Sequence, residues 1–143
     1  MSNIDLTGDI QLAIDGAAER GHTLALGYID DDGYPATSFR GSTQVHDATH
    51  LALWARNKED GFVKAIADRP KVTLLFFEHG GPGPVFLSIR GEAKADPSIN
   101  DAVFEKMIQA EKDHGDKEKG VAVLVEVQSV RGARDDGFFE QGA

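Results

Sequence analysis

The sequence predicts an antiparallel β-barrel of six or more strands with helices at its periphery, and three observations support this fold class. The 143 residues are 41% hydrophobic and 27% charged, which is typical of one globular domain with its own core. The predicted elements follow in the order helix, three strands, helix, two strands, helix and strand. Tight turns join successive strands, as antiparallel pairing allows and a doubly wound parallel sheet does not. We therefore treat residues 1–143 as a single domain.

A helix and a hairpin are predicted at the N-terminus. Residues 7–20 place apolar side chains on one face, with Thr7 in position to cap the first turn, and predict an amphipathic helix. Residues 23–29 are apolar and predict a short strand. The dipeptide Asp32-Gly33 is typical of a tight hairpin turn, so residues 34–46 are expected to pair with this strand.

The second strand of this hairpin carries a polar face. Because side chains alternate along a strand, one face presents four hydrogen-bonding groups in a row: Ser38, Arg40, Ser42 and Gln44. A half-solvated strand of an antiparallel sheet would explain this pattern. A strand that cradles a polar ligand would explain it as well, and both interpretations stay open at this point.

A third strand and a second helix follow. Residues 51–55 are apolar and predict a strand. A helix is expected from a cap at Asn57 to about Arg69, with Asp60 at the capping-box position and Pro70 as its end. The end of a strand therefore leads directly into the start of a helix.

The C-terminal half predicts two further strands, a helix and a last strand. Residues 71–78 are apolar on both faces, so we expect a central strand or one covered on both sides. Residues 85–95 predict a long strand with a bulge or close approach at Gly91. Asp96 can cap a third helix, and residues 121–127 alternate as the last strand. A charged connection and a short tail from residue 131 complete the chain.

Composition and missing motifs exclude several functional classes. The chain has no cysteine, which excludes disulfides, thiolate nucleophiles and iron–sulfur clusters. The net charge of −9 argues against binding to nucleic acid. No apolar run reaches the roughly 20 residues of a membrane span, and the N-terminus lacks a signal-peptide pattern, so we expect a cytoplasmic protein without membrane contact. Dinucleotide and P-loop fingerprints and the HExxH and GxSxG motifs are also absent.

The middle of the chain is relatively basic. Residues 34–72 have a net charge of +2, whereas the segments before and after them have −6 and −5. Arg56 lies just before the second helix, whose unpaired N–H groups favour an anion. Arg40 on the neighbouring strand and Lys64 one turn into the helix could complete a phosphate cradle, although ordinary surface charges would give the same counts. No catalytic acid, base or nucleophile is recognisable, so a bound cofactor would have to carry any chemistry.

The histidines form no metal-ligand pattern. The chain has five: His22, His46, His50, His79 and His114. The closest pair in sequence, His46 and His50, flanks a predicted turn and shares no helix face. We therefore expect no metal site.

Four segments follow one another with a distinctive spacing: HTLALGYIDDDGYPATSFRG, LALWARN, AIADRPKVTLLFFE and VFLSIRGEAKAD. The most diagnostic part is Arg-Pro-x-Val-x-Leu after a helix, followed by a strand with Arg-Gly-x-Ala. In this order the chain resembles the pyridoxamine 5′-phosphate oxidase-like flavoproteins, the FMN-binding split-barrel superfamily. The resemblance covers about residues 22–131 and implies an antiparallel split β-barrel, with the N-terminal helix and the short C-terminal tail outside it.

The resemblance also implies a cofactor and a partner. FMN would lie between the two subunits of a homodimer and exchange hydride with a small-molecule substrate. Its phosphate would be bound by Arg40, Ser42 and Arg56, with Lys58 or Lys64 assisting. The other flavin contacts would come from Gly41, Thr43, Gln44, Trp54 and Ala55.

The chain departs from the family at two places, and two alternatives to FMN stay open. It lacks the C-terminal tryptophan and arginine with which the vitamin-converting oxidases bind their substrate. The oxidases carry Ser-Arg-Lys near the start of the second helix, where this chain has Asp60, Gly61 and Phe62. A deazaflavin coenzyme is one alternative, because related split barrels accept it. The other is a non-catalytic module that binds flavin, or binds haem through His46, His50 or His79.

Overall fold

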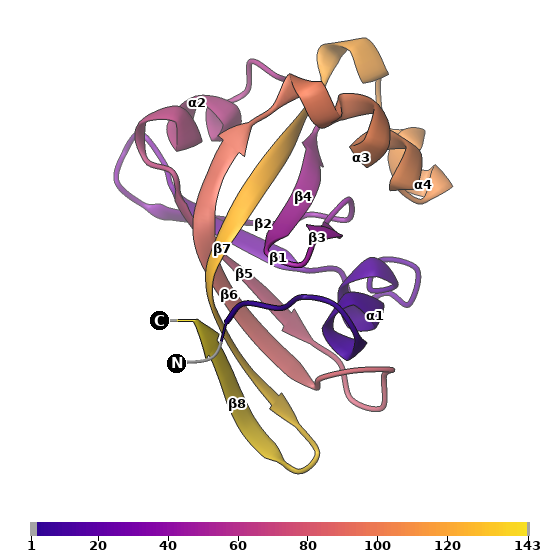
Figure 1. The fold of residues 1–143 in the computed structure, drawn as a ribbon. Coiled ribbons are helices and arrows are strands. Elements are labelled where there is room, and N and C mark those ends of the chain that lie inside the picture. Colours follow the sequence, from indigo (N-terminus) through magenta and orange to yellow (C-terminus); the bar gives the residue numbers. More distant parts are fainter. Residues whose placement is uncertain (1–2, 143) are drawn as a thin grey trace.

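The computed structural model describes residues 3–142 as one curved antiparallel sheet with short helices around it (Figure 1). Within these residues the sheet has eight strands. They are β1 (Ala25–Ile29), β2 (Pro35–Phe39), β3 (Gln44–Asp47), β4 (His50–Ala55), β5 (Lys71–Phe77), β6 (Phe86–Ala95), β7 (Val121–Arg134) and β8 (Gly137–Gly142). The helices are α1 (Asp9–Asp15), α2 (Gly61–Asp68), α3 (Asn100–Lys106) and α4 (Gln109–Lys112), with 3₁₀ turns η1 (Pro97–Ile99) and η2 (Lys117–Lys119). This architecture confirms the predicted fold class.

The order of the strands explains why the barrel is split. The strands run β2-β1-β5-β6-β7-β4-β3, and β8 pairs with the C-terminal half of β7. Because β2 and β3 stand at the two ends of this order, the sheet is not closed. These two strands are consecutive in the chain, so residues 40–43 lead from one edge of the sheet to the other. The segment with the predicted polar face therefore lies at the split.

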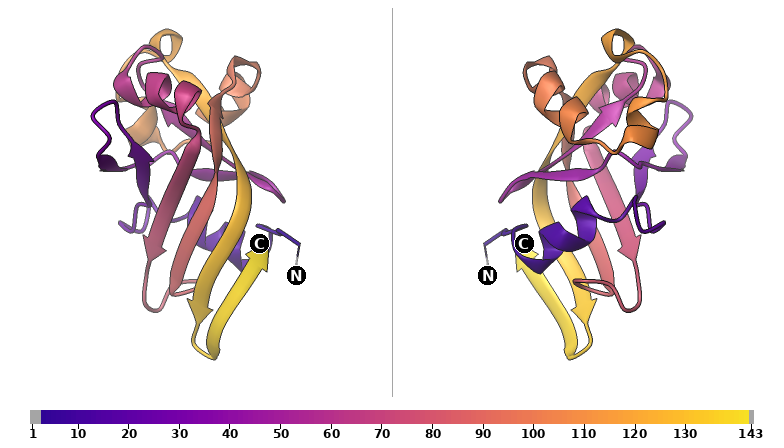
Figure 2. Two further views of the ribbon diagram at one scale, coloured as in Figure 1. Left: turned by 90° about the vertical axis from the view of Figure 1, so that its left-hand side faces the viewer. Right: turned by 90° about the vertical axis from the view of Figure 1, so that its right-hand side faces the viewer.

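The helices gather mainly at one end of the sheet. α2, α3 and α4 lie at this end, and the β7–β8 hairpin extends at the other (Figures 1 and 2). Among residues 3–142, no helix is long and apolar enough to cross a membrane.

Two hydrophobic clusters hold the fold together. The main core includes Ile14 of α1, Leu26 of β1 and Phe62 of α2. A second cluster lies between β4, β7 and α3: Ala52, Trp54, Val103, Met107 and Ala122. Successive residues of β4 enter the two clusters alternately, which is why this strand is apolar on both faces. This second cluster positions the end of β4, where the candidate site begins.

Two element boundaries in the N-terminal half were predicted wrongly. The predicted strand 34–46 is two strands, because the chain turns between Arg40 and Thr43, where the Thr43 N–H donates to the Arg40 carbonyl at 3.2 Å. The predicted helix 7–20 is regular only in α1, which ends at the C-cap Gly16 and continues as turns. Its N-cap is Gly8 and not Thr7.

The second helix begins later than predicted. Its N-cap is Asp60, whose side chain accepts a hydrogen bond from the Val63 N–H at 2.9 Å. Asn57 instead accepts from the Glu59 N–H at 2.9 Å and stabilises a local turn before the helix. Both residue types can cap a helix, and the sequence alone did not distinguish them.

Strand β5 is central but is not covered on both faces. Val72, Leu74 and Phe76 point into the core, whereas Leu75 is 49% exposed and Phe77 is 57% exposed. The strand therefore presents an apolar outer face that the chain itself does not cover.

The C-terminal strands extend beyond their prediction. β7 runs to Arg134, and the expected tail forms β8, which pairs with β7 through a turn at Asp135-Asp136. The third helix is divided into η1, which Asp96 caps, and α3. The predicted bulge at Gly91 is confirmed, because the β6–β7 register shifts there and a side chain would collide with the Glu126 carbonyl. The hairpin at Asp32-Gly33 is also confirmed.

Candidate functional site

A cleft of about 260 Å³ lies where the chain crosses the split. It brings together residues from β2, the crossing segment, β4, the start of α2 and α4. They are Ser38, Phe39, Arg40, Gly41, Ser42, Trp54, Arg56, Asp60 and Glu111. Five of the ten candidate flavin-binding residues are in this set: Arg40, Gly41, Ser42, Trp54 and Arg56.

Arg40 is the central basic residue of the cleft. Its guanidinium carbon lies 4.3 Å from the ring centre of Phe62. A guanidinium stacked on a ring can still donate hydrogen bonds from the N–H groups at its own edge. Its Nε atom and the Oγ atom of Ser38 are both buried without a hydrogen-bond partner in residues 3–142. Burial lowers the pKa of the Arg40 guanidinium, and the Asp60 carboxylate opposes this shift. Unpartnered buried groups are costly, so each of these two atoms has an unused hydrogen bond that a bound group could complete.

Ser42 and Trp54 shape the wall of the cleft. The Ser42 hydroxyl accepts a hydrogen bond from the Trp54 N–H at 2.8 Å and lies 3.4 Å from the Trp54 carbonyl. The indole meets the Phe104 ring edge-on, with centroids 5.2 Å apart, inside the second cluster. Ser42 thus fixes the main chain of β4, and most of the Trp54 ring is used in packing.

Thr43, Gln44 and Ala55 lie beside the cleft rather than in its lining. The Thr43 hydroxyl donates to the Arg40 carbonyl at 2.8 Å. The Gln44 amide donates to the carbonyls of Ser42 and Val103, both at 3.2 Å. Ala55 is fully buried in the main core. These side chains hold the crossing segment in place.

The remaining candidate cations differ in position. Arg56 has a 54% exposed side chain, with Nη2 3.5 Å from Oε1 of Glu111. Lys58 donates to the Glu118 carbonyl at 3.2 Å and lines another cavity. Lys64 is exposed on α2 and does not line the cleft. Arg40 and Arg56 are therefore the cations of the cleft itself.

The cleft fits a phosphate in part. Two arginines and an unpartnered hydroxyl provide the donors that a phosphate group needs. Two carboxylates, Asp60 and Glu111, line the same space and oppose an anion. The two carboxylates do not occupy all the hydrogen-bond donors of the cleft, because Arg40 Nε has no partner in residues 3–142.

The three histidines considered as haem ligands lie apart from the cleft lining. His46 is exposed on β3, and His50 Nδ1 lies 2.8 Å from Oδ1 of Asp47. His79 meets the Phe77 ring edge-on at 5.0 Å. In the described part of the chain, no three His, Asp or Glu side chains lie close enough together to hold a metal ion.

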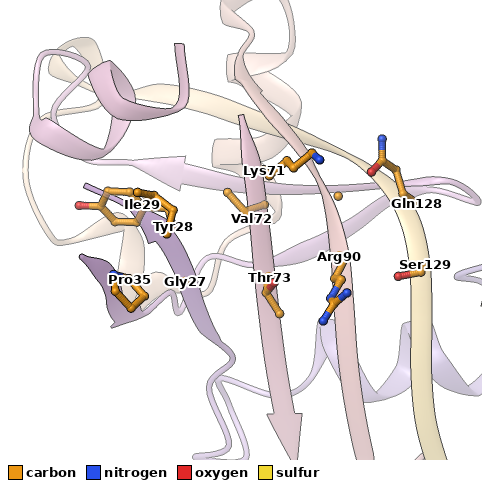
Figure 3. A pocket seen from close by; sticks show the side chains of 11 residues that line it. Gly27, Tyr28, Ile29, Pro35, Lys71, Val72, Thr73, Arg90, Gln128 and Ser129 are labelled. Atoms are coloured by element: carbon orange, nitrogen blue, oxygen red, sulfur yellow. The ribbon is translucent and has the colours of Figure 1, made fainter. Parts of the chain in front are cut away.

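The two largest of the cavities described lie outside the cleft. One of about 580 Å³ lies over β1, β5, β6 and β7, and Lys71, Arg90 and Ser129 are among the side chains around it (Figure 3). Another of about 560 Å³ is lined by His22, Leu75 and Phe77, and it shares Phe39 with the cleft. The sequence did not predict either cavity, because each is formed by strands that are distant along the chain.

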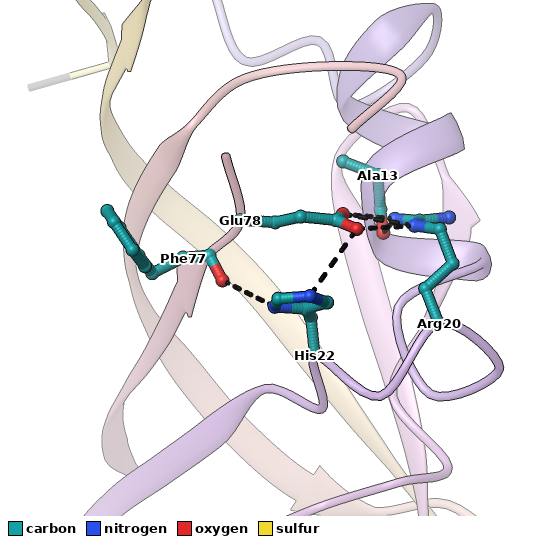
Figure 4. Close-up of polar contacts among 5 residues, drawn as sticks. All are labelled: Ala13, Arg20, His22, Phe77 and Glu78. Carbon is teal, nitrogen blue, oxygen red and sulfur yellow. Dashed lines mark hydrogen bonds and ion pairs between the residues drawn. The ribbon is translucent and has the colours of Figure 1, made fainter. Parts of the chain in front are cut away.

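A second arginine–carboxylate cluster lies near the end of β5 (Figure 4). Glu78 is 7% exposed, and the Nε of Arg20 lies 3.0 Å from each of its carboxylate oxygens. Arg20 also donates to the Ala13 carbonyl at 2.8 Å, and His22 contacts Glu78 at 3.8 Å. The hydrogen bond from Arg20 lowers the pKa of Glu78. This cluster is internally satisfied and ties the turns after α1 to the sheet.

Comparisons with known proteins identify the fold. No protein-family model matches the sequence, and no curated protein matches it. A putative pyridoxamine 5′-phosphate oxidase from Lactobacillus delbrueckii aligns with TM-score 0.61 at 18% identity, over 91% of this chain and 96% of its own. A second from Listeria innocua aligns with 0.60 at 23%, over 82% and 92%. An F420 reductase aligns with 0.61 at 18%, over 81% and 94%.

The chain has the split-barrel fold of the pyridoxamine 5′-phosphate oxidase-like proteins. In this split barrel, four residues that line the cleft were not among the candidate flavin-binding residues: Ser38, Phe39, Asp60 and Glu111. Ser38 was expected on the polar face and Asp60 as a capping residue, so Phe39 and Glu111 are the two that no pattern indicated. Phe39 lies on the opposite face of β2 from Ser38, and as the last residue of the strand it borders both the cleft and the cavity that Leu75 and Phe77 line. Glu111 lies in a helix of four residues, and no periodicity in the sequence indicates where its side chain points.

Proposed function

We propose that this split barrel binds FMN between the subunits of a homodimer and acts as a flavin-dependent oxidoreductase on a small-molecule substrate. The observation that carries the proposal is the pair of unpartnered buried atoms, Arg40 Nε and Ser38 Oγ, in a cleft that also contains Arg56. The likeness to solved pyridoxamine 5′-phosphate oxidase-like structures supports it at the level of the fold.

In this proposal the cleft binds the phosphate end of the flavin. Arg40, held over Phe62, donates from Nε, and the Ser38 hydroxyl donates beside it. Arg56 reaches the same space from the end of β4 and provides a second positive charge. Ser42 and Gln44 contribute indirectly, because they fix the main chain around these donors. Bound FMN would supply the hydride chemistry, and the protein would orient it.

The homodimer is proposed from the outer face of the sheet. Large apolar side chains are exposed on β1, β2, β5 and the first hairpin turn: Ile29, Tyr34, Phe39, Leu75 and Phe77. Phe39, Leu75 and Phe77 line one cavity on this face, and exposed apolar side chains grouped in this way are typical of an interaction surface. Because Phe39 belongs to both this group and the cleft, a second copy on this face would cover the flavin as well.

A deazaflavin coenzyme is the second candidate. The F420 reductase among the structural neighbours supports it. Lys71 and Arg90 border the cavity of about 580 Å³, have no acidic partner in residues 3–142, and could receive the acidic tail of such a coenzyme. FMN is preferred because the smaller cleft suits a single phosphate.

Absorbance and a flavin titration test the proposal. The purified protein is expected to show flavin bands, or to quench FMN fluorescence on titration. Arg40→Ala should weaken FMN binding by roughly tenfold or more, since hydrogen bonds to charged groups contribute about 1.5–3 kcal/mol each. Arg131→Ala is the control, because Arg131 is 68% exposed on β7 outside the cleft. A Soret band would support haem instead, and equal FMN affinity in both variants would refute the assignment of Arg40.

A further inference from the structure

Glu111 places a carboxylate inside the cleft assigned to the phosphate. Its Oε1 atom lies 3.5 Å from Nη2 of Arg56, and its side chain is only 20% exposed. A Cβ atom built on Gly41 would lie 2.6 Å from Oε2 of Glu111. The carboxylate therefore rests against the main chain of the crossing segment, between it and Arg56.

The two carboxylates of the cleft are held very differently. Asp60 accepts the Val63 N–H at 2.9 Å as the N-cap of α2, so its position is fixed by the helix. Within residues 3–142 the carboxylate of Glu111 makes one ion pair, the long one with Arg56, and otherwise rests against Gly41 without a hydrogen bond. An ion pair with such an exposed arginine contributes little to stability. Glu111 is therefore the carboxylate that a competing anion can displace.

The helix that carries Glu111 is also loosely attached. None of the four residues of α4 is buried. Gln109 donates to Asp113 within the same segment at 2.8 Å, and Lys112 makes a 3.8 Å ion pair with the exposed Glu105. A rotation of the Glu111 side chain, or of α4 itself, would therefore leave both hydrophobic clusters intact.

We propose that Glu111 is an internal competitor for the phosphate of the ligand and sets how strongly the cleft prefers phosphorylated over unphosphorylated flavin. This inference rests on the proposed function, because it names the residue that tunes the same cleft. Carboxylate and phosphate oxygens are both acceptors for Arg56, and they repel each other at short distance. A phosphate enters only as Glu111 leaves, whereas riboflavin, which has no phosphate, does not need this exchange.

The test compares Glu111→Gln with a matched control. Glu118→Gln removes the same charge from an exposed position in the segment after α4, outside the cleft lining. FMN and riboflavin are titrated against the wild type and both variants by fluorescence, and inorganic phosphate is titrated by NMR of the arginine side-chain N–H groups. Glu111→Gln should increase the affinity for FMN and for phosphate about three- to tenfold. Riboflavin affinity should stay unchanged, and Glu118→Gln should alter none of the three.

The outcomes separate this inference from the proposed function. Unchanged or weaker FMN affinity in Glu111→Gln would overturn the inference and leave flavin binding intact. If no variant binds either flavin, the proposed function fails, and the phosphate titration still decides the role of Glu111. A higher phosphate affinity in Glu111→Gln than in the wild type then supports the competition, and an equal affinity refutes it.

Discussion

Two half-buried arginines of this molecule, Arg20 and Arg40, use their hydrogen-bonding capacity in opposite ways. The Arg20 guanidinium is satisfied by both oxygens of Glu78 and by the Ala13 carbonyl (Figure 4). Arg40 stacks on Phe62, and its buried Nε has no partner in residues 3–142. A satisfied cluster stabilises the fold, whereas an unsatisfied one lowers stability unless a ligand completes it. The comparison therefore separates a structural cluster from a binding site within one small sheet.

The largest expected effect is the loss of the satisfied pair. Glu78→Gln should lower the free energy of unfolding by about 2–3 kcal/mol, because it leaves a half-buried Arg20 without its counter-ion. The loss stays below that for a fully buried pair, since Arg20 is 29% exposed. Urea unfolding at neutral pH measures it. Flavin affinity should not change, and a parallel loss of affinity would show that the two clusters are coupled.

The contribution of Glu78 should also depend on pH. The hydrogen bond from Arg20, with weaker help from His22, lowers the pKa of Glu78 below its ordinary value of 4.5. A carboxyl whose pKa is lower in the folded state stabilises the protein above its unfolded pKa and loses this effect as the pH falls through the folded pKa. The stability gap between wild type and Glu78→Gln should be present in full above about pH 5 and narrow below about 4.5. A gap that widens in acid would contradict this sign.

Two serines of the same segment make a smaller test of the comparison. Ser42→Ala should cost about 1–2 kcal/mol of stability, because the Trp54 N–H loses its buried acceptor. Ser38→Ala should cost nothing or slightly stabilise, since the Ser38 hydroxyl has no partner to lose in residues 3–142. Thermal unfolding of both variants distinguishes them. Equal destabilisation would mean that the Ser38 hydroxyl is bonded in solution, for example to water.

Local chemistry predicted much of the fold. The hairpin at Asp32-Gly33 and the bulge at Gly91 depend on a turn dipeptide and on a residue without a side chain, and both signals are local. The β7–β8 hairpin turns at Asp135-Asp136, and Gly137 with φ 135° begins β8. Residues from Arg131 on were expected to be a tail, because this turn lacks an Asp-Gly pair at its two central positions.

The candidate site was less predictable, because it depends on contacts between distant segments. Arg40, Ser42 and Arg56 line one cleft, because the crossing segment that carries Arg40 and Ser42 leads into β3, which pairs with β4 just before Arg56. Their role in binding a ligand stays a prediction. The predicted alternation placed Gln44 on the same strand face as Arg40 and Ser42. This was wrong, because the chain turns after Arg40 and the Gln44 amide donates to the Val103 carbonyl. Glu111 enters the cleft from more than 50 residues away, and nothing in its local sequence indicates that position.

The smallest expected effect is also the sharpest test of the comparison. Arg40→Met keeps an apolar side chain against Phe62 and removes an unpartnered buried donor, so stability should rise by about 0.5–1 kcal/mol. Arg20→Met, the matched change in the satisfied cluster, should instead destabilise, because Glu78 loses its counter-ion. FMN affinity should fall in Arg40→Met and persist in Arg20→Met, as measured by fluorescence titration of the folded variants. If Arg40→Met is destabilised as strongly as Arg20→Met, Arg40 belongs to the fold rather than to a binding site.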